Sequence, residues 1–339
     1  MSFISEIRQY KSLSIVGLEK NTGKTECLNY ILKRLPSDNY SVAVTSIGID
    51  GESKDQVTGT AKPEIVIKEG TIFSTSEAYY HRRQVLSELL EITAERSSLG
   101  RIVTARALRS GKVMLGGPSS SQSLGRWVES VAKFGADLTI VDGALSRLSS
   151  ASPIISESLV LTTGAAYSID MERLVRSTKF IVELVGIDLA QNESIAAFKN
   201  LEKGVWGLDS NGNLMDFHLD SSLAVEKAKE DITEKSVALY VAGALTDRFL
   251  GVLADSKRVG EITLVVRDFT KIFVTEQLYR NFVKRGGVLR VLQKSKLVAV
   301  CVNPLSPQGV VLNSELLCKK MRGAIDVPVY DIVREADRV

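Results

Sequence analysis

Nine consecutive residues near the start of the chain have the types and spacing that bind a phosphate group. They follow the apolar run 13–16 and read Gly17-Leu18-Glu19-Lys20-Asn21-Thr22-Gly23-Lys24-Thr25. Small residues let the backbone turn tightly, so that N–H groups at a helix start can point at an anion. Lys24 would contact the terminal phosphates, and the Thr25 hydroxyl is a hard oxygen ligand for Mg²⁺. The sequence therefore predicts that residues 17 and 19–25 contact a nucleotide.

A second candidate metal ligand follows another apolar run. Residues 138–141 are apolar or β-prone, and Asp142 comes directly after them. An acid at the end of a buried strand can hold Mg²⁺, directly or through water, opposite Thr25. A helix cap is the structural alternative for Asp142.

The elements that would position these residues alternate between short apolar runs and amphipathic stretches. We expect strands at 13–16, 41–47, 64–67, 112–115, 138–141 and 159–161, and helices at 25–35, 76–95, 123–134 and 171–183. The strand runs are apolar without strict alternation, which is typical of strands buried on both faces of a parallel sheet. The sequence predicts a doubly wound α/β fold with a mostly parallel sheet. Within the expected helix 76–95, Glu88, Glu91 and Glu95 have helical spacing and would stabilise it by pairing with basic neighbours.

The alternation of short apolar runs and amphipathic stretches is interrupted near residue 190. We expect a nucleotide-binding domain over 1–190, a linker with a β-hairpin over 191–236, and a C-terminal α/β portion over 237–339. The hairpin is predicted at 204–219, where Asp-Ser-Asn-Gly supplies turn residues. The C-terminal portion would be either a domain of its own or an extension of the first sheet.

Composition restricts the function classes. The chain has 43 basic and 40 acidic residues, a net charge of +3, which does not indicate nucleic-acid binding. No uncharged stretch approaches the roughly 18 apolar residues that would span a membrane. Cys27, Cys301 and Cys318 form no closely spaced pair, so we expect buried thiols in a reducing compartment. These observations predict a cytoplasmic protein with no membrane or nucleic-acid partner, and they leave a homo-oligomer open.

The spacing of Gly17, Gly23, Lys24 and Thr25 resembles the loop of dethiobiotin synthetase and the cobyric acid synthase type. Molybdopterin-guanine-dinucleotide biosynthesis proteins of the MobB kind share related features, and all belong to one branch of P-loop NTPases. The resemblance implies a P-loop NTPase fold with ATP as the nucleotide. The branch has an extra lysine near the start of its loop, and Lys20 lies one residue from that register.

The same branch implies roles for residues in two other loops. Asp50 and Glu52 fall where the branch has a metal-linked or water-positioning carboxylate, with a solvated acidic turn as the alternative. With Lys24 they form the predicted catalytic set. Asn303 falls where the synthetase relatives have an asparagine that contacts the base. Turn formation before Pro304 is the alternative for Asn303.

A further resemblance extends over more of the chain. The loop 17–25 and the stretches 141–153 and 161–166 resemble a bacterial family described as a reactivase subunit of adenosylcobalamin-dependent lysine aminomutase. It implies ATP-driven release of damaged cofactor from a radical enzyme, beside a protein partner. The sequence itself contains no Asp-x-His-x-x-Gly motif for cobalamin binding.

Three functions therefore remain open at this stage. The chain could couple ATP hydrolysis to remodelling of a partner enzyme. It could be an ATP-dependent ligase or kinase that activates a small carboxylic acid. It could also be a subunit that binds nucleotide without hydrolysing it.

Overall fold

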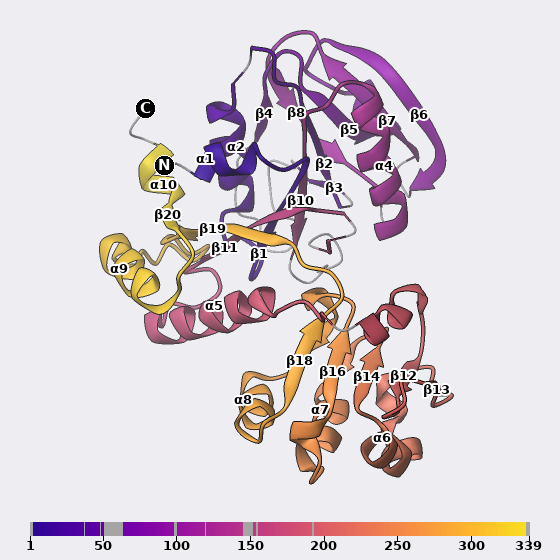
Figure 1. The fold of residues 1–339 in the computed structure, drawn as a ribbon. Helices are drawn as coiled ribbons and strands as arrows, with labels where there is room; N and C mark the ends of the chain where they lie inside the picture. Colours follow the sequence, from indigo (N-terminus) through magenta and orange to yellow (C-terminus); the bar gives the residue numbers. More distant parts are fainter. Residues whose placement is uncertain are drawn as a thin grey trace. The chain divides into compact units, whose positions relative to one another are not determined.

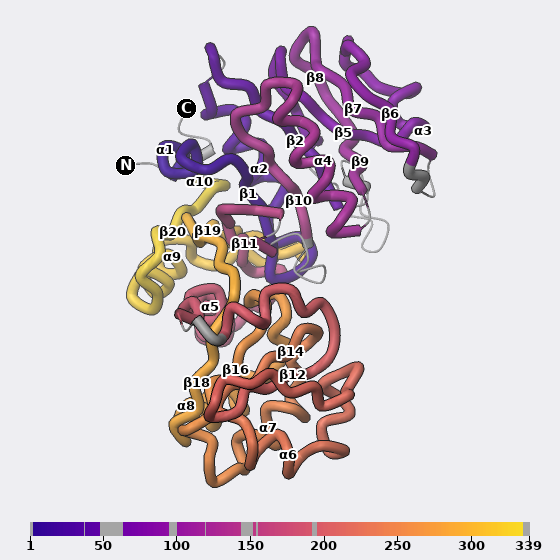
Figure 2. The backbone as a smooth tube through the Cα atoms, turned by 45° about the vertical axis from the view of Figure 1, so that its right-hand side comes forward, coloured from indigo at the N-terminus to yellow at the C-terminus, as the bar shows by residue number. Residues whose placement is uncertain are grey.

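The computed structural model describes residues 3–36, 38–47, 49–50, 64–97, 100–118, 120–144, 152–153, 155–191 and 193–336. The chain divides into two compact units. Unit 1 contains residues 1–182 and 295–339, and unit 2 contains residues 183–294. Figures 1 and 2 show the course of the chain within each unit.

Unit 1 is built on a nine-stranded sheet with the order β20-β19-β11-β1-β10-β2-β5-β7-β6. The seven strands from β20 to β5 are parallel, and β7 and β6 pair antiparallel at one edge. Their bounds are β1 Ser12–Gly17, β2 Val42–Ser46, β5 Ile72–Ser76, β6 Ser87–Ser97, β7 Gly100–Ala107, β10 Leu138–Ala144, β11 Ser158–Gly164, β19 Lys296–Asn303 and β20 Val329–Asp331.

Helices cover both faces of this sheet. One face packs against α2, whose Leu28 and Ile31 share a core cluster with Ile15 and Ile140 of the central strands. The other face packs against α4 through Trp127. The helices of unit 1 are α1 Phe3–Ile7, α2 Lys24–Arg34, α3 Glu77–His81, α4 Ser121–Lys133, α9 Ser314–Ala324 and α10 Ile332–Ala336, and α5 (Met171–Gly186) runs from unit 1 into unit 2.

The predicted α/β class and mostly parallel sheet are confirmed. Burial on both faces explains why the central strands lack alternation, since every residue of β1 is buried. Two predicted strands do not join the main sheet. Instead, β4 (Ile65–Ile67) pairs with β8 (Gly111–Val113), and β3 (Ile49–Asp50) pairs with β9 (Leu115–Gly116).

The predicted helix over 76–95 is wrong. A short helix, α3, ends at His81, and the edge strand β6 begins at Ser87. Glu88 and Glu91 lie in this strand and not on a helix face. Register shifts between Leu89 and Glu91, and again after Ile92, break the alternation of period two. These β-bulges give the apolar residues a spacing that resembles helical periodicity.

Unit 2 has a five-stranded sheet with the order β13-β12-β14-β16-β18. The strands are β12 Val205–Leu208, β13 Leu214–Asp216, β14 Ala238–Val241, β16 Thr263–Val266 and β18 Val288–Val291, and the short strands β15 Leu245–Thr246 and β17 Ile272–Phe273 pair separately. The helices are α6 Lys229–Lys235, α7 Asp247–Asp255 and α8 Glu276–Lys284, with 3₁₀ turns η2 Glu193–Asn200, η3 Ser222–Ala228, η4 Val259–Glu261 and η5 Phe269–Lys271.

The boundaries of these units differ from the predicted division. The expected hairpin is confirmed as β12 and β13, but it belongs to the sheet of unit 2 and not to a linker. The predicted portion 237–339 is split, because 295–339 returns to unit 1. There β19 pairs with β11, and β20 pairs with β19. An apolar run shows that a strand is buried, but not which sheet contains it.

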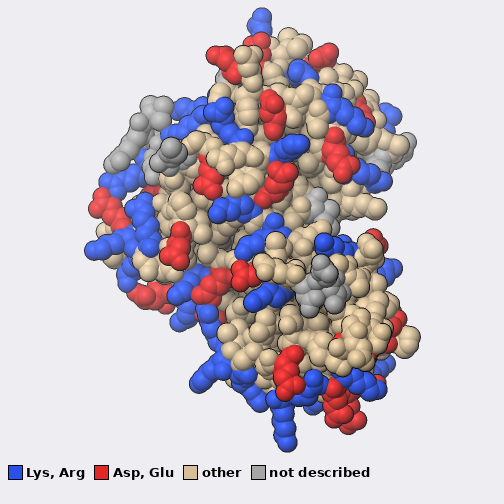
Figure 3. All heavy atoms as spheres, viewed as in Figure 1, with Lys and Arg blue, Asp and Glu red and all other residues tan. Residues whose placement is uncertain are grey.

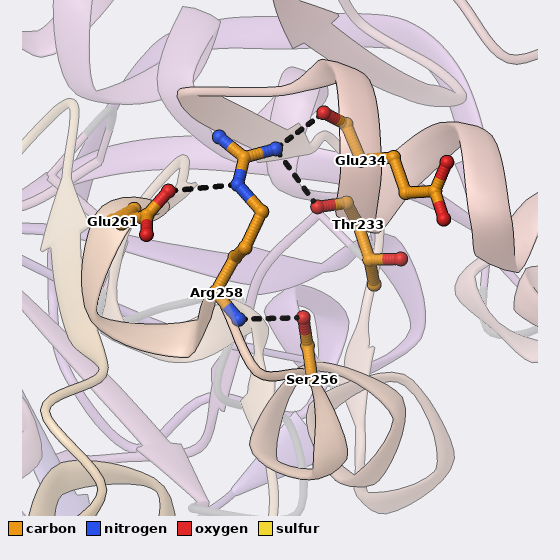
Figure 4. Close-up of polar contacts among 5 residues, drawn as sticks. All are labelled: Thr233, Glu234, Ser256, Arg258 and Glu261. Carbon is orange, nitrogen blue, oxygen red and sulfur yellow. Dashed lines mark hydrogen bonds and ion pairs between the residues drawn. The ribbon is translucent and has the colours of Figure 1, made fainter.

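One arginine joins several turns of unit 2. The guanidinium of Arg258 donates to the Thr233 carbonyl at 3.1 Å and to the Glu234 carbonyl, near the end of α6 (Figure 4). Its Nε donates to Glu261 at 2.7 Å, and its backbone N–H donates to the Ser256 hydroxyl at 3.1 Å. A cation at a helix C-terminus satisfies carbonyls and complements the helix dipole.

Two further expectations concern burial and charge. The three cysteines are buried, as predicted, and in the described part of the chain none is in a disulfide. The Sγ atoms of Cys27 and Cys301 lie 3.8 Å apart. Lys and Arg are interspersed with Asp and Glu over the face drawn in Figure 3. None of the helices in the described ranges is both long and apolar enough to span a membrane.

Candidate functional site

The loop between β1 and α2 has the backbone geometry of an anion cradle. Asn21 has φ 61° and Gly23 has φ 91°, so two residues adopt the left-handed conformation within three positions. Such turns bring successive N–H groups to one side. Gly23 precedes α2 and provides no side-chain cap, whereas Ser120 caps α4 with its hydroxyl. The start of α2 is therefore left open to an external acceptor.

Four N–H groups where the loop enters α2 have no partner among the described residues. Within the described ranges, the amides of Thr22, Gly23, Lys24 and Thr25 donate to no protein group. Within the first turn, the Cys27 amide donates to the Gly23 carbonyl at 2.9 Å. Four adjacent donors with the positive end of a helix dipole form the arrangement that binds phosphate oxygens.

Buried hydroxyls hold the loop in this shape. Thr22 is fully buried, and its hydroxyl donates to the Glu19 carbonyl at 2.9 Å. It also lies 3.1 Å from the hydroxyl of Thr162 on β11. The Leu18 amide donates to the Thr162 carbonyl at 3.0 Å. A Cβ on Gly17 would lie 2.4 Å from the Thr22 hydroxyl, so only glycine fits there.

The two loop lysines differ in their surroundings. Lys24 is half-buried, and its Nζ lies 3.5 Å from the Glu19 carbonyl, on the opposite side of the same loop. Lys20 and Glu19 are exposed, and the Glu19 carboxylate accepts from the Lys20 amide at 2.9 Å. The geometry therefore brings Lys24 to the cradle, while Lys20 is in the position of a solvated loop charge.

Asp142 lies on the strand next to the loop strand. It is opposite Ile15 of β1 in the parallel register, and only 1% of its surface is exposed. Ile15 and Ile140 both pack toward α2. Because side chains two residues apart share a face, Asp142 is on the face that α2 covers. The aspartate is thus on the same side of the sheet as Lys24 and Thr25.

Asp142 belongs to a row of polar residues at the carboxyl ends of the strands. Asp142 is opposite Ser46 on β2, and Thr75 lies at the end of β5 beyond it. On the other side of β1, Gly17 is opposite Thr162. The side chains of these polar residues are all buried. On the face that α2 covers, apolar residues precede them in the same strands, such as Ile140 before Asp142 and Val44 before Ser46.

The sequence places Thr162 in a loop of small residues at this edge without giving it a contact, and sequence reasoning missed Ser46 and Thr75 as part of this site. Ser46 lies in a predicted strand and Thr162 directly follows one, whereas Thr75 belongs to β5, which was not predicted. A short hydroxyl side chain carries little signal by itself. The only available clue was their shared position at strand ends, because parallel strands end at one edge. Gly117 packs closely on Ser46, since a Cβ there would lie 2.0 Å from the Ser46 carbonyl.

Two predicted site residues lie wholly or partly outside the described residues. Asp50 is in β3, where it pairs with Leu115, but its side chain is not described. Glu52 lies outside the described residues. These two predictions of a catalytic or water-positioning carboxylate therefore stay predictions.

Asn303 ends β19 and lies beside the loop. A Cβ on Gly23 would be 3.1 Å from the Asn303 Cβ. The Asn303 carbonyl accepts from Ala165 at 2.9 Å, and its Oδ1 accepts from Leu305 at 3.0 Å. The predicted turn before Pro304 is therefore present.

Comparisons with known proteins leave the family open. No family model matches the chain, and no curated protein or solved structure matches it either. Among the described residues, no group of three or more His, Cys, Asp or Glu side chains could hold a metal ion. A metal at this loop would therefore need oxygen ligands from hydroxyls or from a bound phosphate as well as Asp142.

Proposed function

We propose that the chain is a Mg²⁺-dependent P-loop NTPase that binds the polyphosphate of a nucleoside triphosphate at the loop between β1 and α2, through the amides of Thr22 to Thr25. The observation that carries the proposal is the set of four adjacent amides, from Thr22 to Thr25, that have no acceptor in the described protein. A buried network holds these amides in place, so little ordering would be needed when an anion binds.

Lys24 and Asp142 add charges of opposite sign to the cradle. The ammonium of Lys24 can move from the Glu19 carbonyl to a phosphate oxygen, because the present contact is long at 3.5 Å. There it would neutralise charge that develops on the transferred phosphoryl group. Asp142 lies on the face covered by α2 and would attract a cation toward the same place.

The donor set fits Mg²⁺. The hydroxyl of Thr25 and the carboxylate of Asp142 are hard oxygen ligands, and Mg²⁺ commonly combines one or two of these with phosphate oxygens and water. When bound, the ion would offset the charge of the phosphates. Asp50 or Glu52 would orient the attacking water in the resulting hydrolysis.

The choice of ATP and of a protein partner rests on the resemblances of the sequence. The reactivase resemblance implies that hydrolysis drives a change in a cobalamin-dependent aminomutase, and we propose this coupling as the physiological role. Stimulation of hydrolysis by a partner protein would support it. A small carboxylic acid that becomes phosphorylated would favour the ligase or kinase alternative, and binding without hydrolysis would favour the non-hydrolysing subunit.

The direct test is a titration of MgATP and MgGTP by calorimetry with the full chain. Lys24→Ala should reduce affinity at least a hundredfold, because a charge-assisted contact to phosphate is lost. Lys20→Ala is the matched control, since it removes an exposed lysine from the same loop and should change affinity less than threefold. Equal effects of the two variants would contradict the proposed site.

A second variant separates metal binding from nucleotide binding. Asp142→Asn keeps the size of the side chain and removes its charge. We expect it to fold normally and to lose Mg²⁺-dependent hydrolysis, while metal-free nucleotide still binds. Unchanged hydrolysis at limiting Mg²⁺ would remove Asp142 from the metal site.

A further inference from the structure

The side-chain oxygen of Asn303 accepts a hydrogen bond, and its side-chain nitrogen lies near the loop between β1 and α2. Its Oδ1 accepts from the Leu305 amide at 3.0 Å, which assigns the oxygen and the nitrogen of the side chain. The Nδ2 atom would be 3.3 Å from a Cβ on Gly23, so it is directed toward the phosphate loop. In the described part of the chain, Nδ2 donates to no acceptor.

We infer that Asn303 is a phosphate-binding residue and not a base-reading one. This inference rests on the proposed function and assigns a further contact within the same site. An asparagine that reads an adenine base uses its oxygen and its nitrogen together. The oxygen of Asn303 is turned toward the Leu305 amide, and the part of the side-chain amide nearest Gly23 is the Nδ2 donor. A donor beside four unpaired amides suits the anionic oxygens of a polyphosphate.

The backbone around Asn303 fixes this position. Its carbonyl accepts from the Ala165 amide at 2.9 Å. A Cβ on Gly164 would lie 1.9 Å from the same carbonyl, so β11 and β19 approach closely here. The strand end that carries Asn303 is thus anchored to β11, the strand that also supplies the Thr162 contact to the loop.

The test compares inorganic tripolyphosphate, MgATP and MgGTP as ligands of the full chain. Asn303→Asp keeps an oxygen for the Leu305 amide and replaces the donor by a carboxylate. It should weaken tripolyphosphate and both nucleotides by a similar factor, about ten- to a hundredfold, with an unchanged ratio of ATP to GTP affinity. Asn303→Ala removes the donor without adding charge and should weaken all three by a smaller common factor.

Asn313→Asp is the matched control. Asn313 is the N-cap of α9, with Oδ1 accepting from Leu316 at 2.9 Å, so the change alters another hydrogen bond from a backbone amide to an asparagine oxygen outside the loop. It should leave all three affinities unchanged.

Other results distinguish the alternatives. Loss of ATP affinity with tripolyphosphate binding intact, or an altered ratio of ATP to GTP affinity, would overturn the inference and restore the base contact. Full binding of all ligands by both Asn303 variants would overturn it as well. Failure of the unmodified chain to bind any of the three would remove the proposed function itself.

Discussion

The contact between Thr22 and Thr162 offers a test of the loop that needs no ligand. Thr22→Val keeps the shape of the side chain but removes its hydroxyl. The Glu19 carbonyl then loses a donor at 2.9 Å, and the buried Thr162 hydroxyl loses its partner at 3.1 Å. A lost hydrogen bond costs about 1 kcal/mol, and an unsatisfied buried hydroxyl costs about 1–3 kcal/mol. We therefore expect the free energy of unfolding of unit 1 to fall by about 2–4 kcal/mol.

The reciprocal change should cost less. Thr162→Val leaves the Thr22 hydroxyl bonded to Glu19, so the expected loss is about 1 kcal/mol. The double variant contains neither hydroxyl and leaves no orphaned hydroxyl between the two positions. Its loss should be smaller than the sum of the single losses by about 1 kcal/mol, the usual coupling of neighbouring residues.

The two tryptophans provide the assay. Trp127 is buried in unit 1, and Trp206 belongs to unit 2. In a Trp206→Phe background, urea unfolding followed by fluorescence reports unit 1 through Trp127 alone. Equal losses for the two single variants, or additivity to within about 0.5 kcal/mol, would refute the proposed network.

Three further predictions concern backbone fit, pH and unit 2. Gly17→Ala should weaken MgATP binding at least tenfold, because its Cβ would lie 2.4 Å from a buried hydroxyl. Gly125→Ala is the control, because a Cβ at this position in α4 would meet open space. It should raise the free energy of unfolding by roughly 0.5–1 kcal/mol and leave MgATP binding unchanged. A tenfold loss of MgATP binding in Gly125→Ala would contradict this reasoning. Hydrogen bonds from Arg101 lower the pKa of Glu77 from 4.5 to about 2, so this pair stabilises the fold above pH 4.5 and its contribution fades as pH falls toward 2. Glu77→Gln should therefore lower the urea midpoint at pH 7 and match the unmodified chain near pH 2, and a constant difference across this range would count against the pair. Arg258→Ala should lower the unfolding free energy of unit 2 by about 1–3 kcal/mol when measured through its own tryptophan, with the transition of unit 1 unchanged.

The local pattern of residue types was sufficient to predict the fold class and the loop between β1 and α2. The apolar run before Gly17 and the glycine and lysine that follow are contiguous, so strand, turn and helix start could be predicted together. Asp142 could be predicted for the same reason, because it directly follows an apolar run in the sequence. These features depend on neighbours along the chain.

The features that sequence reasoning missed depend on neighbours in space. Thr162 supports Thr22 only because β11 lies beside β1, which no local pattern reveals. Residues 295–339 return to unit 1 after residues 183–294 have formed unit 2. The apolar runs in 295–339 do not indicate which strand they pair with. In β6, bulges near Leu89 and Ile92 imitate helical spacing, so the periodicity indicated the wrong element.

The central claim is that the amides from Thr22 to Thr25 bind a polyphosphate. Hydrogen exchange measured by mass spectrometry on the full chain, with and without saturating MgATP, tests it most directly. We expect slower exchange in peptides that cover residues 18–27, and no such change in Lys24→Ala at the same nucleotide concentration. Exchange in these peptides that stays the same when MgATP is bound would contradict the account.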